Sequence, residues 1–241
     1  MNIGVIFAGG VGVRMHSKEK PKQFLNLYNK PIIIHTLEHF EENNDIDAVV
    51  IACVEDWISH LENLLYKYRI SKVSKIVPGG NTGQLSIYNG LLAAKEISDQ
   101  EKSIVLIHDG VRPLINTKLL SDNIKTVKKY GSCITAGVVT ETIVVVDEGL
   151  DVEQVPSRSK SRIAKAPQSF WLDDILRVHE KALSDKVYDS IDSCTLMKNY
   201  GYQLHMIDGP HENIKITTPE DFYIMRAIIE SKENGQIYGF N

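Results

Sequence analysis

The residues best suited to chemistry lie near the start of the chain, where a group of glycines precedes two cationic side chains. Gly9, Gly10 and Gly12 follow a short apolar run, and Arg14 and Lys22 come soon after them. Glycines let backbone N–H groups approach phosphate oxygens closely, because no Cβ stands in the way. Arg14 and Lys22 would add positive charge beside the same turn. This stretch therefore predicts a turn that binds a triphosphate.

Two familiar phosphate-binding patterns do not fit this turn. A P-loop closes with Gly-Lys-Ser or Gly-Lys-Thr, whereas Val13 and Arg14 follow Gly12 here. The dinucleotide fingerprint needs a third glycine where Met15 stands, and an acidic residue about 20 residues further on. A plain strand-to-helix turn is the alternative, but such turns rarely carry both an arginine and a following Pro-Lys-Gln. The pattern favours a nucleotide site of another kind.

An aspartate at the end of an apolar run is the candidate metal ligand. Asp109 follows the run at 103–108 and precedes a Gly-Val-Arg-Pro segment. Mg²⁺ prefers one or two carboxylates together with substrate phosphates, so a carboxylate that faces a triphosphate would suit it. Arg112 could bind an anionic second substrate. The alternative is an Asx turn before Pro113.

Three further stretches carry groups whose roles the sequence leaves open. Gly80, Asn81 and Ser86 lie between a strand and a helix, where they could contact a base edge or simply cap the helix. Lys215 lies in an apolar, strand-like context, which favours a phosphate contact over a surface position. A basic cluster consists of Arg158, Lys160, Arg162 and Lys165. This cluster is either a solvated run of charges or a phosphate site.

Strands and helices are expected to alternate along the first half of the chain. Buried strands are predicted at 3–7, 48–53, 75–77 and 103–108, and helices at 32–40, 56–68, 85–97 and 116–130. This alternation predicts an α/β fold with a Rossmann-like, mostly parallel sheet covered by helices on both faces. Ligands of such sheets lie beyond the carboxyl ends of the strands, where Gly9, Gly80 and Asp109 all fall. A single domain over residues 1–241 is completed by predicted helices at 172–183, 190–200 and 219–231 and a strand at 203–207.

The alternation breaks between residues 133 and 165. This stretch is rich in Val, Ile and Thr on either side of a turn at Glu148 and Gly149, which predicts a protruding β-arm. A two-stranded arm is marginally stable alone, so we expect it to pack on a second subunit and form a homodimer. The alternative is a hairpin that folds back on its own domain.

The composition limits the kinds of partner. The chain has 241 residues and a net charge of −4, which argues against nucleic-acid binding driven by overall positive charge. Its three cysteines are scattered and odd in number, as in proteins of a reducing compartment. No apolar run reaches the ~18 residues of a membrane span, and the chain does not begin with a secretory signal pattern. We therefore expect a cytoplasmic protein without a membrane partner.

Taken in order, these motifs resemble the sugar-alcohol-phosphate cytidylyltransferases, a family similar to the methylerythritol-phosphate enzymes. The resemblance extends from Ile3 to about Ile229. Its elements are residues 8–15, 21–24, 79–86, 108–113, 167–168 and 213–217. The pair Gly9-Gly10, the pair Asp56-Trp57 and the segment 155–158 resemble the ribitol-5-phosphate branch. The implied fold is that of the nucleotide-diphospho-sugar transferases.

The resemblance also implies roles for residues at matching positions. Arg14, Lys22 and Lys215 would be the catalytic cations, and Asp109 would hold Mg²⁺. CTP would be contacted by Ala8, Gly9, Gly10, Gly12, Arg14, Lys22, Gly80, Asn81, Ser86 and Asp109. The polyol phosphate would be surrounded by Asp109, Arg112, Thr142, Arg158 and Lys215. Thr142 and Arg158 would act in the partner subunit's site, since the arm crosses over in this family.

The implied activity is CMP transfer from CTP to D-ribitol 5-phosphate, which yields CDP-ribitol and pyrophosphate and would serve teichoic-acid or capsule synthesis. Methylerythritol phosphate or another pentitol phosphate is the alternative acceptor. A regulatory protein without turnover would not need Asp109, and Met15 disfavours a Rossmann oxidoreductase. Two positions depart from the family pattern: Gly83 stands where an arginine is usual, and Ala166 replaces the threonine of Thr-Pro-Gln.

Overall fold

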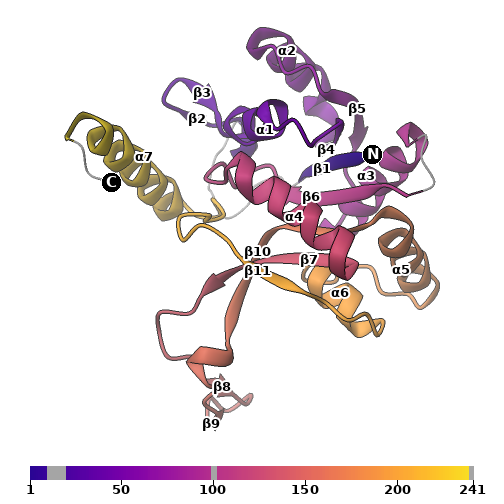
Figure 1. Ribbon diagram of the computed structural model, residues 1–241, viewed down its shortest axis with the longest axis vertical. Coiled ribbons are helices and arrows are strands. Elements are labelled where there is room, and N and C mark those ends of the chain that lie inside the picture. Colours follow the sequence, from indigo (N-terminus) through magenta and orange to yellow (C-terminus); the bar gives the residue numbers. More distant parts are fainter. Residues whose placement is uncertain (10–19, 99–101, 239–241) are drawn as a thin grey trace.

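A seven-stranded sheet forms the centre of the protein, with the strand order β11-β7-β10-β6-β1-β4-β5 (Figure 1). The computed structural model describes residues 1–9, 20–98 and 102–238. The predicted parallel part of the sheet is confirmed. β1 (Asn2–Ala8) pairs in parallel with β4 (Ala48–Cys53) and β6 (Ile104–Asp109), and β4 pairs in parallel with β5 (Val73–Pro78). These strands end at one edge of the sheet, which is the edge that carries the site.

The other side of the sheet differs from the prediction. β7 (Ser132–Val138) and β10 (Arg162–Trp171) pair antiparallel with each other, and β10 also pairs antiparallel with β6. β11 (Met206–Asp208) runs parallel to β7 and begins later than the strand predicted at 203–207. The predicted arm boundaries of 133 and 165 are therefore wrong, because both ends of that range belong to the central sheet. The arm itself spans residues 139–161.

Helices cover both faces of the sheet, as the alternating pattern predicted. They are α1 (Ile32–Glu42), α2 (Ile58–Tyr68), α3 (Gly83–Ile97), α4 (Thr117–Tyr130), α5 (Leu172–Ser184) and α6 (Ser193–Asn199). The last helix, α7 (Pro219–Tyr238), projects to one side of the sheet (Figure 1), and its Met225 packs in a small separate cluster with Ile32 and Val111. The apolar side chains of α1, α2 and α4 share one core cluster with Ile6, while those of α3, α5 and α6 share another with Val5. Successive residues of a strand point to opposite faces, so β1 supplies both cores. Among the described residues, no helix is long and apolar enough to cross a membrane.

Local signals fix the ends of several helices. Asn116 precedes α4, and its side chain accepts a hydrogen bond from the backbone N–H of Leu119 at 2.8 Å. The same helix ends at Gly131, which has a φ of 85°. At the start of α7, the Asp221 carboxylate accepts hydrogen bonds from the N–H groups of Thr217 and Thr218 at 2.8 Å each. This cap fixes the chain that follows Lys215.

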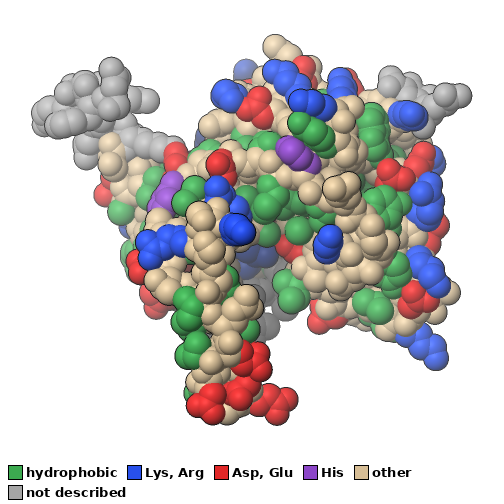
Figure 2. All heavy atoms as spheres, turned by 60° about the horizontal axis from the view of Figure 1, so that its bottom comes forward, with side chains coloured by type: hydrophobic (Ala, Val, Ile, Leu, Met, Phe, Trp, Pro, Cys, Tyr) green, Lys and Arg blue, Asp and Glu red, His purple; other side chains and the backbone are tan. Residues whose placement is uncertain are grey.

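Shorter elements complete the structure. The 3₁₀ helix η2 (Lys22–Phe24) precedes the small hairpin of β2 (Asn26–Leu27) and β3 (Lys30–Pro31). Further 3₁₀ helices in the described part of the chain are η3 (Glu55–Trp57) and η4 (Arg158–Lys160). The arm pairs only β8 (Val145–Val146) with β9 (Val152–Gln154). It extends away from the sheet (Figure 1), and acidic side chains gather at its tip (Figure 2).

Candidate active site

Two adjoining cavities open at the carboxyl ends of the central strands. The first, here called the glycine cavity, measures about 330 Å³ and is lined by the predicted residues Ala8, Gly9, Lys22, Gly80, Asn81, Ser86, Asp109 and Lys215. The second, here called the Arg112 cavity, measures about 310 Å³. Phe7, Gly83, Asp109 and Lys215 line both. The prediction that the Gly9, Gly80 and Asp109 turns converge is therefore confirmed.

Close packing between two turns explains the glycine at the end of β1. A Cβ on Gly9 would lie 2.8 Å from Ser86 Oγ and 3.5 Å from the Gly79 Cα. The Ser86 hydroxyl accepts a hydrogen bond from the Gly80 N–H at 3.0 Å and lies 2.9 Å from the Thr82 carbonyl oxygen. Ser86 thus holds the Gly80 turn in shape. The capping role that the sequence left open belongs to Thr82, whose hydroxyl accepts from the Leu85 N–H.

Lys22 reaches the glycine cavity because its neighbour is anchored. The Gln23 side chain is buried and donates a hydrogen bond from Nε2 to the Ala8 carbonyl oxygen at 2.6 Å. On the other side, the Phe24 ring stacks on Trp57 with ring centroids 4.9 Å apart. These contacts hold η2 against the end of β1. No such role was predicted for Gln23, although it stands in the Pro-Lys-Gln motif.

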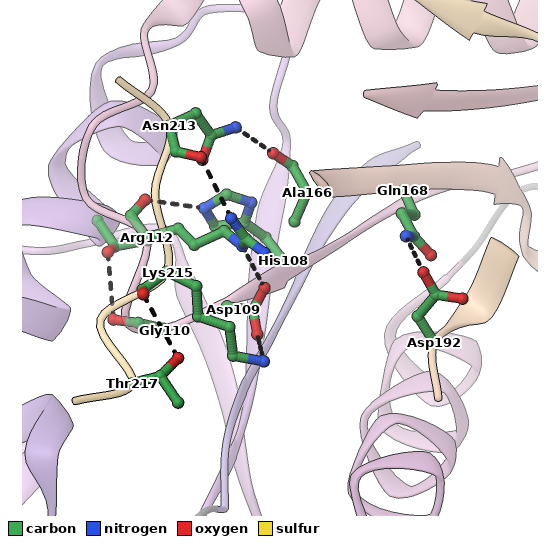
Figure 3. Close-up of polar contacts among 11 residues, drawn as sticks. His108, Asp109, Gly110, Arg112, Ala166, Gln168, Asp192, Asn213, Lys215 and Thr217 are labelled. Carbon is green, nitrogen blue, oxygen red and sulfur yellow. Dashed lines mark hydrogen bonds and ion pairs between the residues drawn. The ribbon is translucent and has the colours of Figure 1, made fainter. Parts of the chain in front are cut away.

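Asp109 lies between two cations at the wall that the cavities share. Its Oδ1 is 2.6 Å from Lys215 Nζ, and its Oδ2 accepts a hydrogen bond from Arg112 Nε at 2.7 Å; Figure 3 shows both cations pointing at the carboxylate. The side chain of Asp109 is 7 % exposed, that of Arg112 13 % and that of Lys215 39 %. Burial alone would raise the pKa of Asp109, but Lys215 and Arg112 outweigh it and hold that pKa well below its usual range.

The neighbours of Arg112 fix its position. Arg112 Nη1 donates to the Asn213 carbonyl oxygen at 3.2 Å, and its own carbonyl oxygen lies 3.1 Å from His108 Nε2. Asn213 is fully buried and donates from Nδ2 to the Ala166 carbonyl oxygen at 2.6 Å. These contacts tie β6, β10 and the strand-like segment of Lys215 together (Figure 3). Asp109, Arg112 and Lys215 are therefore preorganised.

A second polar pair lies at the far side of the Arg112 cavity. Gln168 donates from Nε2 to Asp192 Oδ2 at 2.9 Å and accepts from the Cys194 N–H at 2.8 Å. Gln84 donates to the Val187 carbonyl oxygen at 2.7 Å. Both glutamines thus hold the segment between α5 and α6 over the cavity. The motif Pro167-Gln168 was the only sequence signal for this arrangement.

The structure does not bring every predicted residue into the cavities. Thr142 and Arg158 lie together on the exposed arm, with Arg158 Nη2 3.1 Å from Thr142 Oγ1. Neither residue lines either cavity of its own chain. Gly10, Gly12 and Arg14 lie outside the described residues. Their predicted contacts with CTP stay predictions.

Comparison with known proteins places this geometry in a family. Residues 3–231 match the family model described as IspD, 2-C-methyl-D-erythritol 4-phosphate cytidylyltransferase. A ribitol-5-phosphate cytidylyltransferase of Vibrio parahaemolyticus is 56 % identical, over 99 % of this chain and the whole of that protein. The chain belongs to the IspD cytidylyltransferase family. It is thus a nucleotidyltransferase, and the predicted enzyme class and family are confirmed.

Other members of the IspD family are less similar to this chain. A 2-C-methyl-D-erythritol 4-phosphate cytidylyltransferase of Clostridium novyi is 38 % identical, over 95 % of this chain and 97 % of that protein. The crystal structure of 4-diphosphocytidyl-2C-methyl-D-erythritol synthase from Anaerococcus prevotii superposes with a TM-score of 0.82 at 26 % identity, covering 95 % and 96 % of the two chains. The predicted α/β fold is confirmed by this likeness.

The two departures from the IspD family pattern affect side chains only. A Cβ on Gly83 would meet no atom within 4 Å, so the larger side chain usual in the family has space to start there. Gly83 lines both cavities, and its small size leaves room between them. Ala166 contributes its carbonyl oxygen to Asn213, an interaction that does not depend on its side chain. Neither departure disturbs Asp109 and its two cations.

The surroundings of Asp109 show whether this predicted metal ligand suits Mg²⁺. Among residues 1–9, 20–98 and 102–238, no three His, Cys, Asp or Glu side chains are grouped so as to hold a metal ion. Asp109 is the one carboxylate among the described residues that line the glycine cavity. This fits Mg²⁺, which typically takes one or two carboxylates and completes its shell with substrate phosphates and water.

Proposed function

We propose that this enzyme transfers CMP from CTP to D-ribitol 5-phosphate and releases pyrophosphate. The observation that carries the proposal is the meeting of two cavities at Asp109 and Lys215, which suits a reaction between two phosphates. The acceptor is chosen from the relatives: the ribitol-5-phosphate enzyme of Vibrio parahaemolyticus is 56 % identical, against 38 % for the methylerythritol-phosphate enzyme of Clostridium novyi. CTP would occupy the glycine cavity.

The chemistry would depend on positioning and charge. A phosphate oxygen of the polyol phosphate would attack the α-phosphorus of CTP in line, and pyrophosphate would leave. The attacking phosphate is already ionised at neutral pH, so no general base is needed. Two anions must approach each other, and preorganised cations lower the cost of that approach. Lys22 and Arg14 would bind the triphosphate, while Lys215 would stabilise the reacting phosphates.

Asp109 is the residue that would hold Mg²⁺, together with phosphate oxygens of CTP. The ion would supply positive charge next to the triphosphate. Lys215 and Arg112 flank the same carboxylate and hold its pKa below the usual range, so that it is ionised at neutral pH.

The active form would be a homodimer. The arm exposes apolar side chains that a single chain leaves uncovered, among them Ile143, Val144, Val145, Val146, Leu150, Val152 and Val155. In the dimer, Thr142 and Arg158 would reach the partner subunit's site. We also place the enzyme in the cytoplasm, where CTP is made. Its three cysteines are free, as is typical of proteins in a reducing compartment.

A pyrophosphate-release assay with CTP and a panel of polyol phosphates tests the proposal. Release with ribitol 5-phosphate, abolished by EDTA and restored by excess Mg²⁺, is expected. Release with methylerythritol phosphate alone would support the second candidate, which the match to the family model favours. Release unaffected by EDTA would contradict the metal role of Asp109.

A further inference from the structure

The basic cluster at 158–165 is not one site but several separate environments. Arg158 contacts Thr142 on the arm, and Arg162 pairs with Asp208 at 3.1 Å. Both are exposed at the surface. Lys165 differs from them: it is half-buried in β10 and lines the Arg112 cavity. Lys165 therefore belongs to the Arg112 cavity and not to the arm.

Lys165 is held in place by neutral groups. Its Nζ donates to the carbonyl oxygens of His211 at 3.0 Å and Pro210 at 3.5 Å. No carboxylate in the described part of the chain lies within ion-pair distance of it. Burial, followed by the charge of Arg112, lowers the pKa of the Lys165 ammonium, and the more distant charge of Glu212 offsets this only in part. A half-buried cation without a carboxylate at ion-pair distance is costly, and a bound anion would reduce that cost.

The fold keeps space for this side chain. Gly137 lies in β7 beside β10, and a Cβ on it would lie 2.7 Å from Lys165 Cε and 3.2 Å from Lys165 Nζ. The absence of a side chain at Gly137 thus leaves room for the Lys165 side chain to pass over β7. The obstructed atoms are the far end of a flexible chain, so an added methyl would displace Lys165 rather than break the strand.

The charges around Lys165 point to a doubly charged ligand. Arg112, Lys165 and Lys215 all line the Arg112 cavity, whereas Asp109 is the carboxylate paired with two of them. At its other side the cavity offers the Asp192 carboxylate and Ser190, which suit hydroxyl donors. A phosphate monoester with a polyhydroxyl chain combines these two requirements.

We propose that Lys165, with Arg112, binds the phosphate of the polyol phosphate, and that the polyol chain extends toward Asp192. This rests on the proposed function and identifies the pocket of its acceptor. The phosphate would then lie beside Lys215, at the wall shared with the glycine cavity. That is where a nucleophile must be to reach the α-phosphorus of CTP.

Steady-state kinetics of Lys165→Ala test the proposal. The KM for ribitol 5-phosphate is expected to rise at least about tenfold, the size of a lost charge-assisted hydrogen bond, while the KM for CTP changes less than about twofold. Lys165→Arg should recover part of the loss. Lys128→Ala, which removes an exposed lysine of α4, is the matched control and should leave both constants unchanged.

Gly137→Ala gives an independent test that keeps the charge. It should raise the KM for ribitol 5-phosphate by displacing the Lys165 ammonium, and it should add nothing in a Lys165→Ala background, because coupled residues are not additive. An unchanged polyol KM in Lys165→Ala, a rise confined to the CTP KM, or additive effects would each overturn the assignment. A wild-type enzyme inactive with ribitol 5-phosphate would instead refute the proposed function itself.

Discussion

Lys215 Nζ lies 2.6 Å from Asp109 Oδ1, although one residue ends a central strand and the other comes from the far end of the chain. Arg112 holds the other oxygen of the same carboxylate at 2.7 Å. The carboxylate therefore fixes two cations at the wall between the cavities. The positions of the two cations thus depend on their shared contact with Asp109.

Replacement of Lys215 by methionine tests the catalytic part of this arrangement. Lys215→Met should lower kcat by about 10²-fold or more, as the loss of a preorganised transition-state contact does. The fold should survive, because Arg112 still balances Asp109. Pyrophosphate release and thermal unfolding measure the two effects. Turnover close to that of the wild type would remove Lys215 from the catalytic residues.

The close contact between Gly9 and Ser86 predicts a steric effect on the nucleotide site. Gly9→Ala would push Ser86 off the Gly80 turn, so the CTP KM should rise and the free energy of unfolding should drop by ~1–3 kcal/mol, as for other overpacked positions. Gly83→Ala is the stability control, because its Cβ meets nothing within 4 Å. Equal unfolding curves for the two variants would contradict the packing argument.

Much of this site was predictable, because strands and turns carry local signals. The apolar runs that became β1 and β6 end at Gly9 and Asp109, and parallel strands bring their carboxyl ends together. The arm boundaries were not predictable in the same way. Val, Ile and Thr fill both the buried strand β7 and the exposed arm that follows it, so composition does not separate them.

Contacts between a side chain and a distant backbone group leave no pattern in the sequence. Gln23 anchors η2 to Ala8, and Asn213 anchors Arg112 to Ala166, yet no spacing of residues connects these partners. Arg112 and Lys215 could each be predicted as a site residue from the sequence. That both contact the carboxylate of Asp109 is seen only in the folded structure.

A buried histidine should make stability depend on pH. His179 is 1 % exposed, and burial lowers its pKa from 6.5 to about 4. The unfolded chain takes up this proton near pH 6.5 and the folded protein only near pH 4. The contribution of neutral His179 to the free energy of unfolding is therefore fully present above pH 6.5. It is lost as the pH drops toward 4, by ~3 kcal/mol in total.

The substitution His179→Phe isolates this contribution. Phenylalanine keeps an aromatic ring beside Tyr88, on which His179 stacks with ring centroids 5.8 Å apart. The difference in unfolding free energy between variant and wild type should shift in favour of the variant as the pH falls from 6.5 to 4. Denaturant unfolding at several pH values measures it. A difference that does not vary with pH would show that His179 is not the responsible group.

Mixed dimers test whether the arm acts on the partner. Arg158→Ala and Lys215→Met should each be nearly inactive alone. If the arm crosses over, each mixed dimer has one intact site, so a randomised equal mixture should recover roughly a quarter of the wild-type activity. Co-purification of differently tagged subunits serves as the control for subunit exchange. If each arm serves its own subunit, no recovery will occur.

Direct competition between the two candidate acceptors tests which polyol phosphate the enzyme uses. Ribitol 5-phosphate and methylerythritol 4-phosphate would be supplied together at equal concentration with CTP and Mg²⁺, and the two CDP-polyols would be counted by mass spectrometry. Their initial ratio equals the ratio of kcat/KM values. We expect CDP-ribitol to form in large excess. A product mixture dominated by the methylerythritol derivative would contradict it.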